Sequence, residues 1–155
     1  MATNHFDDPN IPDEERLFRR IHLTHVVEGE DGGSEVSSAA FRDTELSVNL
    51  EAVMRATGRE PNDSLQDNPN DLLMSLTAGV CRGSGQIVGP DPRPEEPAHG
   101  YAFGKKSKSI QRALRDAAGW IVPSATPSWE EIRLRKEQLG IGGKDPGATS
   151  KNRSA

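Results

Sequence analysis

The chain has 155 residues, a formal net charge of -5 at pH 7, 33% hydrophobic residues and 5% aromatic residues. This length allows one domain of ordinary size and excludes two, and the low hydrophobic fraction, with 15 glycines and 11 prolines, predicts a small core with long loops. The acidic balance excludes a polycation that binds nucleic acid or lipid by bulk charge, so a basic site has to be local.

Cysteine usage and hydropathy favour a cytoplasmic protein. Cys81 is the single cysteine, which excludes an intrachain disulfide and a zinc site built from several thiolates. No apolar run approaches the roughly 18 residues that span a bilayer, and residues 1–10 carry acidic side chains where a signal peptide carries basic ones. We expect no membrane partner, no metal and no cofactor.

The first elements read as an arm, a hairpin and a strand. Residues 1–15 are polar, acidic and broken by prolines, which predicts an extended or disordered arm. Residues 17–27 alternate well enough for a strand, and the turn-forming GEDGG then leads into a partner strand over 35–41. ELSVNL, residues 45–50, has the cleanest period-two pattern in the chain and predicts a strand.

The middle of the chain predicts helices and two short strands. A short helix follows ELSVNL and ends at Gly58. Asn70 is the predicted N-cap of a helix over 71–82, in which leucines recur at helical spacing. GSGQIVG, residues 83–89, and HGYAFG, residues 99–104, predict strands on either side of a proline-rich loop.

The last main helix begins near Ser107 or Ser109 and carries one apolar stripe until Pro123 ends it. After a linker, Ser128 forms a capping box with a glutamate three residues later and begins a short helix over about 128–139. This helix either docks on the core or detaches from it, and the tail after it is predicted to be disordered.

Together, these patterns predict a small α+β domain over residues 16–122. Its mostly antiparallel sheet has four to five short strands, and two main helices pack against it. The predicted arm, 1–15, and the linker, short helix and tail of 123–155 lie outside this domain.

Two blocks of the chain, SSAAFRDTELSVNL and EEPAHGYAFGKKSKSIQRAL, resemble those of a group of small uncharacterised bacterial proteins. These proteins pair a Ser-Ser-Ala-x-Phe-Lys/Arg-Asp segment with a later Pro-Ala-His segment and a basic helix start. The resemblance spans most of residues 11–122 and implies that both blocks belong to one domain without the terminal arms. It implies no activity and no functional residue.

The basic segment before the last main helix is the densest candidate site. It is not a Walker A loop, because Gly100 and Gly104 are separated by three residues instead of four. Lysines at a helix N-terminus are repelled by the helix dipole, and a bound anion reverses that penalty. The segment therefore predicts an anion-binding surface made of Lys105, Lys106, Ser107, Lys108, Arg112 and Arg115. The alternative is a solvated basic face that compensates acidic neighbours.

A second constellation involves an early arginine and a late histidine. Arg19 or Arg20 on an early strand, with Ser37 and Ser38 on a later one, resembles two of the three elements with which ADP-ribosyltransferase-like folds hold a nicotinamide dinucleotide. The third element is a glutamate or histidine on a late strand, where only His99 is available. His99 is thus the candidate catalytic residue, as acid, base or ligand, and a structural histidine is the alternative.

His22 and His25 raise the question of a metal site. On a strand, a spacing of three residues directs the two rings to opposite faces, so they cannot share one ion unless the segment is helical or bulged. Cys81 lies in an apolar stretch and is predicted to be a small buried hydrophobe instead of a nucleophile.

Three function classes follow. The leading hypothesis is a non-enzymatic binding module that contacts nucleic acid or a nucleotide through the basic helix start. The second is a small enzyme acting on a nucleotide-like substrate, with His99 and Arg19 or Arg20 in a cleft. The third is a protein-binding accessory subunit that docks through the stripe formed by Trp129, Ile132 and Leu139.

Overall fold

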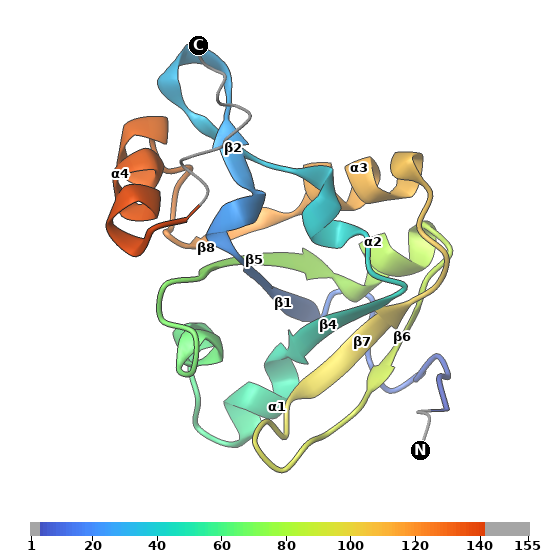
Figure 1. The fold of residues 1–155 in the computed structure, drawn as a ribbon. Helices are drawn as coiled ribbons and strands as arrows, with labels where there is room; N and C mark the ends of the chain where they lie inside the picture. Colours follow the sequence, from blue (N-terminus) through green and yellow to red (C-terminus); the bar gives the residue numbers. More distant parts are fainter. Residues whose placement is uncertain (1–3, 142–155) are drawn as a thin grey trace.

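A six-stranded antiparallel sheet forms the centre of the computed structural model, which describes residues 4–141 (Figure 1). The strands follow the order β6-β7-β4-β1-β5-β8. They are β1 (Arg16–Ile21), β4 (Glu45–Leu50), β5 (Leu72–Thr77), β6 (Ile87–Pro90), β7 (His99–Phe103) and β8 (Gly119–Val122). A separate hairpin consists of β2 (Val26–Glu28) and β3 (Ser34–Val36).

The helices are α1 (Glu51–Ala56), α2 (Ala78–Gly83), α3 (Lys108–Ala117) and α4 (Trp129–Leu139). Four short 3-10 turns join the elements: η1 (Leu23–His25), η2 (Glu30–Gly32), η3 (Ser38–Phe41) and η4 (Pro61–Leu65). No helix within residues 4–141 is both long and apolar enough to cross a membrane.

The sheet buries both of its faces. One face carries the larger cluster, in which Leu46 and Val48 of β4 meet Leu114 of α3 and Ile132 of α4. The other face carries a smaller cluster, in which Phe18 of β1 packs with residues of α1 and η4. The α+β class and the antiparallel sheet are therefore confirmed, but the sheet has six strands instead of four to five.

The predicted helix over 71–82 is wrong in its first half. Residues 72–77 form β5, and the α2 helix begins only at Ala78, where Thr77 instead of Asn70 caps it by accepting a hydrogen bond from the Val80 amide. β5 is central and largely buried, with β1 on one side and β8 on the other. A strand buried on both faces reads as a continuous apolar run, which periodicity cannot tell from a buried helix.

The ends of three other predicted elements differ from the sequence pattern. The strand expected over 17–27 breaks at η1 into β1 and β2, and the second strand of the hairpin ends at Val36. The α3 helix ends at Ala117, because Ala118 is extended and the chain continues as β8, which pairs with β5. Pairing with a central strand outweighs the helical stripe there.

Neither end of the described chain is detached from the domain. Ile11 is buried, and the Tyr101 hydroxyl accepts a hydrogen bond from the amide of Phe6 and donates one to its carbonyl. Arg82 binds Asp7 and Asp13. The arm predicted to be extended or disordered is thus packed on the domain over residues 4–15, with turns at residues 9–10 and 13–14. Most of the predicted disordered tail, residues 142–155, lies outside the described residues.

Lys106 is buried at the end of β7, where its ammonium group caps backbone carbonyls. Its Nζ donates to the carbonyl oxygens of Thr44, Ala102 and Gly104 at 3.0, 3.0 and 3.2 Å. The side chain thereby ties the end of β7 to the start of β4.

Lys106 should give the protein a specific pH dependence of stability. Burial lowers the pKa of Lys106 to about 8, so above that pH the folded chain releases a proton that the unfolded chain keeps until its ordinary lysine pKa, near 10.4. Between these values, the free energy of unfolding of the wild type should rise relative to that of Lys106→Met, by up to about 3 kcal/mol. Urea denaturation at pH 7 and pH 10 measures this difference, and equal pH slopes for the two proteins would contradict it.

Candidate functional site

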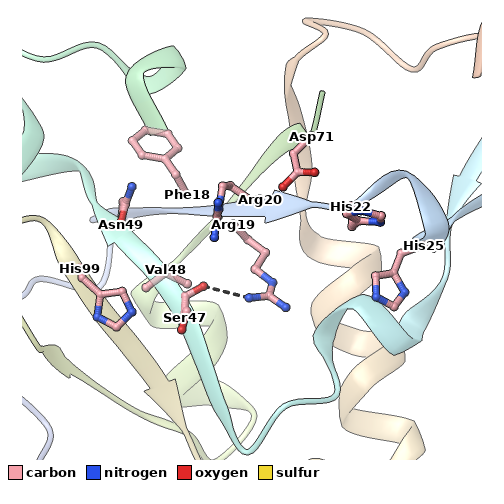
Figure 2. A pocket seen from close by; sticks show the side chains of 10 residues that line it. All are labelled: Phe18, Arg19, Arg20, His22, His25, Ser47, Val48, Asn49, Asp71 and His99. Carbon is pink, nitrogen blue, oxygen red and sulfur yellow. Dashed lines mark hydrogen bonds between the residues drawn. The ribbon is translucent and has the colours of Figure 1, made fainter. Parts of the chain in front are cut away.

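The candidate site begins where two neighbouring strands separate. β1 pairs with β5 from Arg16 to Ile21 but with β4 only through Leu17↔Leu50 and Phe18↔Asn49. Beyond Phe18 the two strands diverge, and Figure 2 shows side chains from both lining the opening between them. A split inside a sheet leaves backbone groups without ladder partners, so other donors have to satisfy them.

Arg19 donates hydrogen bonds across this split. The Leu50 amide points to the β7 side, so by strand alternation the Ser47 carbonyl points toward β1. Arg19 Nη1 donates to that carbonyl at 3.2 Å (Figure 2). Its Nε and Nη2 both donate to the Ala40 carbonyl, at 3.2 and 2.9 Å, and Nη2 reaches Asp43 Oδ2 at 3.5 Å. Guanidinium has five N–H donors, so one Nη1 hydrogen has no partner among the described residues.

A cavity of ≈ 230 Å³ occupies the split. Residues that are distant in the sequence converge on it, from β1, the turn after it, β4, the segment before β5, and β7. Its lining is Phe18, Arg19, Arg20, His22, His25, Ser47, Val48, Asn49, Asp71 and His99. The site therefore combines two arginines and three histidines with a single carboxylate.

Partial burial shifts the charge states around this cavity. Burial, with Arg42 and Arg19 nearby, lowers the pKa of His25, which favours the neutral imidazole. Burial raises the pKa of Asp71, against the opposing influence of His22 and the arginines. Both pKa shifts favour the neutral forms of His25 and Asp71. The arginines therefore carry the main charges of the cavity.

His99 is held by one ring nitrogen and unpartnered at the other. Its Nδ1 lies 3.1 Å from the Asp91 carbonyl oxygen and 3.4 Å from Asp91 Oδ2. The residue is only 8% exposed, and its Nε2 is buried without a hydrogen-bond partner among residues 4–141. Leaving a buried polar atom without a hydrogen-bond partner costs about 1 to 3 kcal/mol of folding free energy. A hydrogen bond to Nε2 from a bound molecule would remove this cost.

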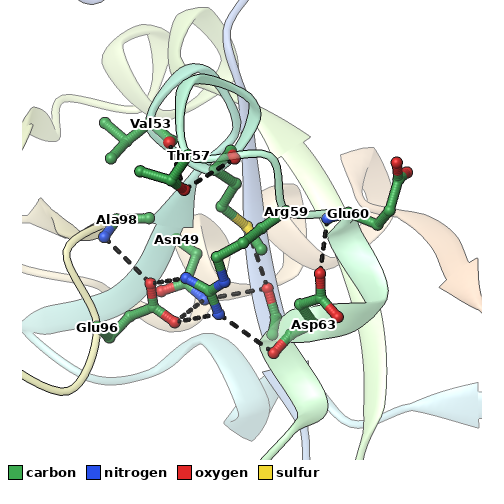
Figure 3. Close-up of polar contacts among 10 residues, drawn as sticks. Asn49, Val53, Thr57, Arg59, Glu60, Asp63, Glu96 and Ala98 are labelled. Atoms are coloured by element: carbon green, nitrogen blue, oxygen red, sulfur yellow. Dashed lines mark hydrogen bonds and ion pairs between the residues drawn. The ribbon is translucent and has the colours of Figure 1, made fainter.

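A second cavity, of ≈ 260 Å³, adjoins the first and shares Arg20, Asn49 and His99 with it. An ion pair supports its wall, since Arg59 Nη2 donates to Glu96 Oε1 at 2.9 Å (Figure 3). Burial opposes ionisation of Glu96, but hydrogen bonds from Arg59 and the Ala98 amide hold its pKa below the ordinary value.

The predicted anion surface before α3 is only partly available. Lys106 is buried on backbone carbonyls, and the Ser107 hydroxyl caps α3 by accepting from the Ile110 amide at 3.2 Å. Arg115 pairs with Asp116 at 3.0 Å. Burial removes Lys106 from the surface, whereas Ser107 stays exposed with its hydroxyl engaged in the helix cap. Lys105, Lys108 and Arg112 are exposed and stay a predicted anion-binding group.

The stripe predicted to dock a protein partner lies mostly against the chain's own core. Ile132 is fully buried, and Trp129 is partly buried against the larger hydrophobic cluster. Lys136 of α4 donates to the Val26 carbonyl at 2.7 Å, which fixes the helix on the hairpin. Leu139, 42% exposed, is the one residue of the three that remains accessible. The short helix therefore docks.

The structure brings Arg19, Arg20 and His99 into one cavity but leaves Ser37 and Ser38 outside its lining. His22 and His25 line the same cavity because η1 breaks the strand between them. No group of three metal-ligating side chains forms among residues 4–141, so the pair gains no third ligand there. Sequence reasoning missed Ser47, Asn49 and Asp71, and the polar side of ELSVNL was the available signal for the first two.

The stability of the fold around the split should depend on Arg19 far more than on Arg20. Arg19→Ala leaves the Ala40 and Ser47 carbonyls without their donor, and we expect the free energy of unfolding to fall by about 2 to 4 kcal/mol. The matched control is Arg20→Ala, which removes an exposed side chain and should cost less than about 1 kcal/mol. Urea denaturation distinguishes the two, and equal losses would refute a structural role for Arg19.

Known proteins offer no guide to this site. No family model matches the chain, and no curated protein or solved structure is significantly similar to it. The resemblance of the two sequence blocks to small bacterial proteins therefore stays a prediction, and the chemistry of the cleft has to be argued from its geometry.

Proposed function

We propose that the cavity between β1 and β4 binds a small, phosphate-bearing molecule of the nucleotide type. The observation that supports this proposal is the convergence of Arg19, Arg20, His22, His25 and His99 on one cavity. Asp71 is the single carboxylate among the lining residues, and burial raises its pKa. An anion is thus the ligand that this lining favours.

A phosphate suits these donors better than a lone carboxylate. They approach from several elements around the cavity, and a tetrahedral phosphate presents acceptor oxygens in several directions at once. Arg19 is fixed by backbone carbonyls before any ligand arrives, so little side-chain entropy would be lost when it binds. The proposal keeps the anionic partner expected from the sequence, but it places that partner in the cavity between β1 and β4 instead of at the start of α3.

Adenosine monophosphate and adenosine form a matched pair of probes for this proposal. Titration calorimetry should detect binding of the monophosphate and not of the nucleoside, because only the former carries the anion. The double variant Arg20→Gln/His22→Gln should weaken binding at least about tenfold, the equivalent of 1.4 kcal/mol. Both residues are exposed, so the variant should fold.

The control is the triple variant Lys105→Gln/Lys108→Gln/Arg112→Gln at the start of α3, which should bind the monophosphate as the wild type does. Loss of binding in this variant, with retention in the cleft variant, would transfer the site to the helix start. Absence of binding to the wild type would refute the proposal.

An enzymatic role is the second candidate, and His99 is the residue that favours it. Asp91 contacts Nδ1 and leaves Nε2 free, which is how a positioned general base is commonly held. Arg19 and His99 line the same cavity, which supports the likeness to ADP-ribosyltransferase-like folds, although Ser37 and Ser38 are not part of that lining. On this proposal, His99 removes a proton from a water molecule whose oxygen forms a bond to the anomeric carbon of the ribose. The bond from that carbon to the nicotinamide nitrogen breaks, and neutral nicotinamide leaves with the bonding electron pair.

Release of nicotinamide from the dinucleotide tests this candidate. The wild type should release it, and His99→Gln should do so at least about 100-fold more slowly, in the range expected for loss of a general base, while still binding adenosine monophosphate. Release at equal rates by both proteins, or none by the wild type, would exclude a catalytic His99 in this reaction.

A further inference from the structure

The two adjoining cavities have the dimensions of one ligand site. Their volumes are ≈ 230 and ≈ 260 Å³, and each lies below the roughly 300 Å³ at which ligand pockets usually begin. Together they fall inside the usual range. They share Arg20, Asn49 and His99, and Arg20 also donates to Asn68 in the lining of the second cavity. The Arg20 side chain thus lies along the boundary between the two cavities.

The two cavities differ in chemistry. The first is dominated by arginine and imidazole groups. The second mixes arginines with carboxylates and amides, among them Asp63, Asp67, Glu95, Gln66 and Asn68. Carboxylate and amide oxygens accept hydrogen bonds from hydroxyl groups, and amide nitrogens donate to them. A neutral group rich in hydroxyls therefore fits the second cavity as a phosphate fits the first.

His99 supplies an independent sign of a ligand at the junction. It lines both cavities, is more than nine-tenths buried, and has no partner at Nε2 in the part of the chain that the structure describes. Its neighbour across the strands, Asn49, already donates to Ser64 Oγ at 3.0 Å. A hydroxyl group placed at the junction would give Nε2 its missing hydrogen bond in either tautomer, because a hydroxyl both donates and accepts.

We infer that the ligand is a sugar phosphate, with its phosphate in the β1–β4 cavity, its sugar hydroxyls in the adjoining cavity, and the link between them beside His99. This inference rests on the proposed function, in which the β1–β4 cavity holds the phosphate of a nucleotide-type molecule. It adds that the second cavity recognises the sugar and contributes to affinity.

Three probes separate the two statements: inorganic phosphate, ribose 5-phosphate and ribose, each titrated calorimetrically into the full chain. Ribose 5-phosphate should bind at least tenfold more tightly than inorganic phosphate. The variant Gln66→Ala/Asp67→Ala changes two exposed residues of the second cavity only. It should reduce the affinity for ribose 5-phosphate to that for phosphate and leave phosphate binding unchanged.

The outcomes are distinct. If inorganic phosphate and ribose 5-phosphate bind the wild type equally, or if the double variant keeps the tenfold preference, the sugar subsite is refuted and the phosphate site stands. If neither phosphate compound binds, the proposed function itself fails. Binding of ribose without a preference for its phosphate would also overturn the assignment of the two cavities.

Discussion

The site depends on one arginine that stands where strand pairing stops. β1 leaves β4 after two residue pairs, and Arg19 donates to the Ser47 carbonyl that the departing strand no longer reaches. Its other hydrogen bonds go mainly to the Ala40 carbonyl. The Asp43 carboxylate lies 3.5 Å away and is largely exposed. A cation held by neutral dipoles keeps more of its field than one neutralised by a close carboxylate. The Arg19 side chain therefore links the β4 edge of the split to the Ala40 carbonyl, and under the proposed function it also attracts an anion into the cavity.

A second cation of the domain, Lys106, is also held by backbone carbonyls. Lysines before α3 are unfavourable for the helix dipole, which made an anion the natural explanation from the sequence. Lys106 has a different one, since its ammonium satisfies three carbonyls where β7 ends. A buried lysine of this kind contributes to the fold and is withdrawn from the surface, whereas Lys105 and Lys108 remain in solvent.

Elements with a polar and an apolar side were predicted well from the sequence. ELSVNL, whose residues alternate between buried and half-buried, forms β4 with the expected bounds. HGYAF also forms the expected strand, β7, although its first four residues are all buried. The prediction failed for β5, because LLMSLT is buried on both sides and has no polar stripe to set its period. It also failed at the end of α3, where pairing of β8 with β5 outweighed the helical pattern. In both cases, pairing with a strand remote in the sequence determined the secondary structure.

For the site, the sequence singled out Arg19 and Arg20 through the likeness to ADP-ribosyltransferase-like folds, and His99 as the one histidine available for the third element of that likeness. Their meeting in one cavity could not be read from the chain. It requires β1 and β4 to separate after Phe18, η1 to turn His22 and His25 toward the same side, and β7 to present His99 beside Asn49. Each of these depends on strand register and divergence, which arise from long-range pairing and core packing and leave no periodic signal in the sequence.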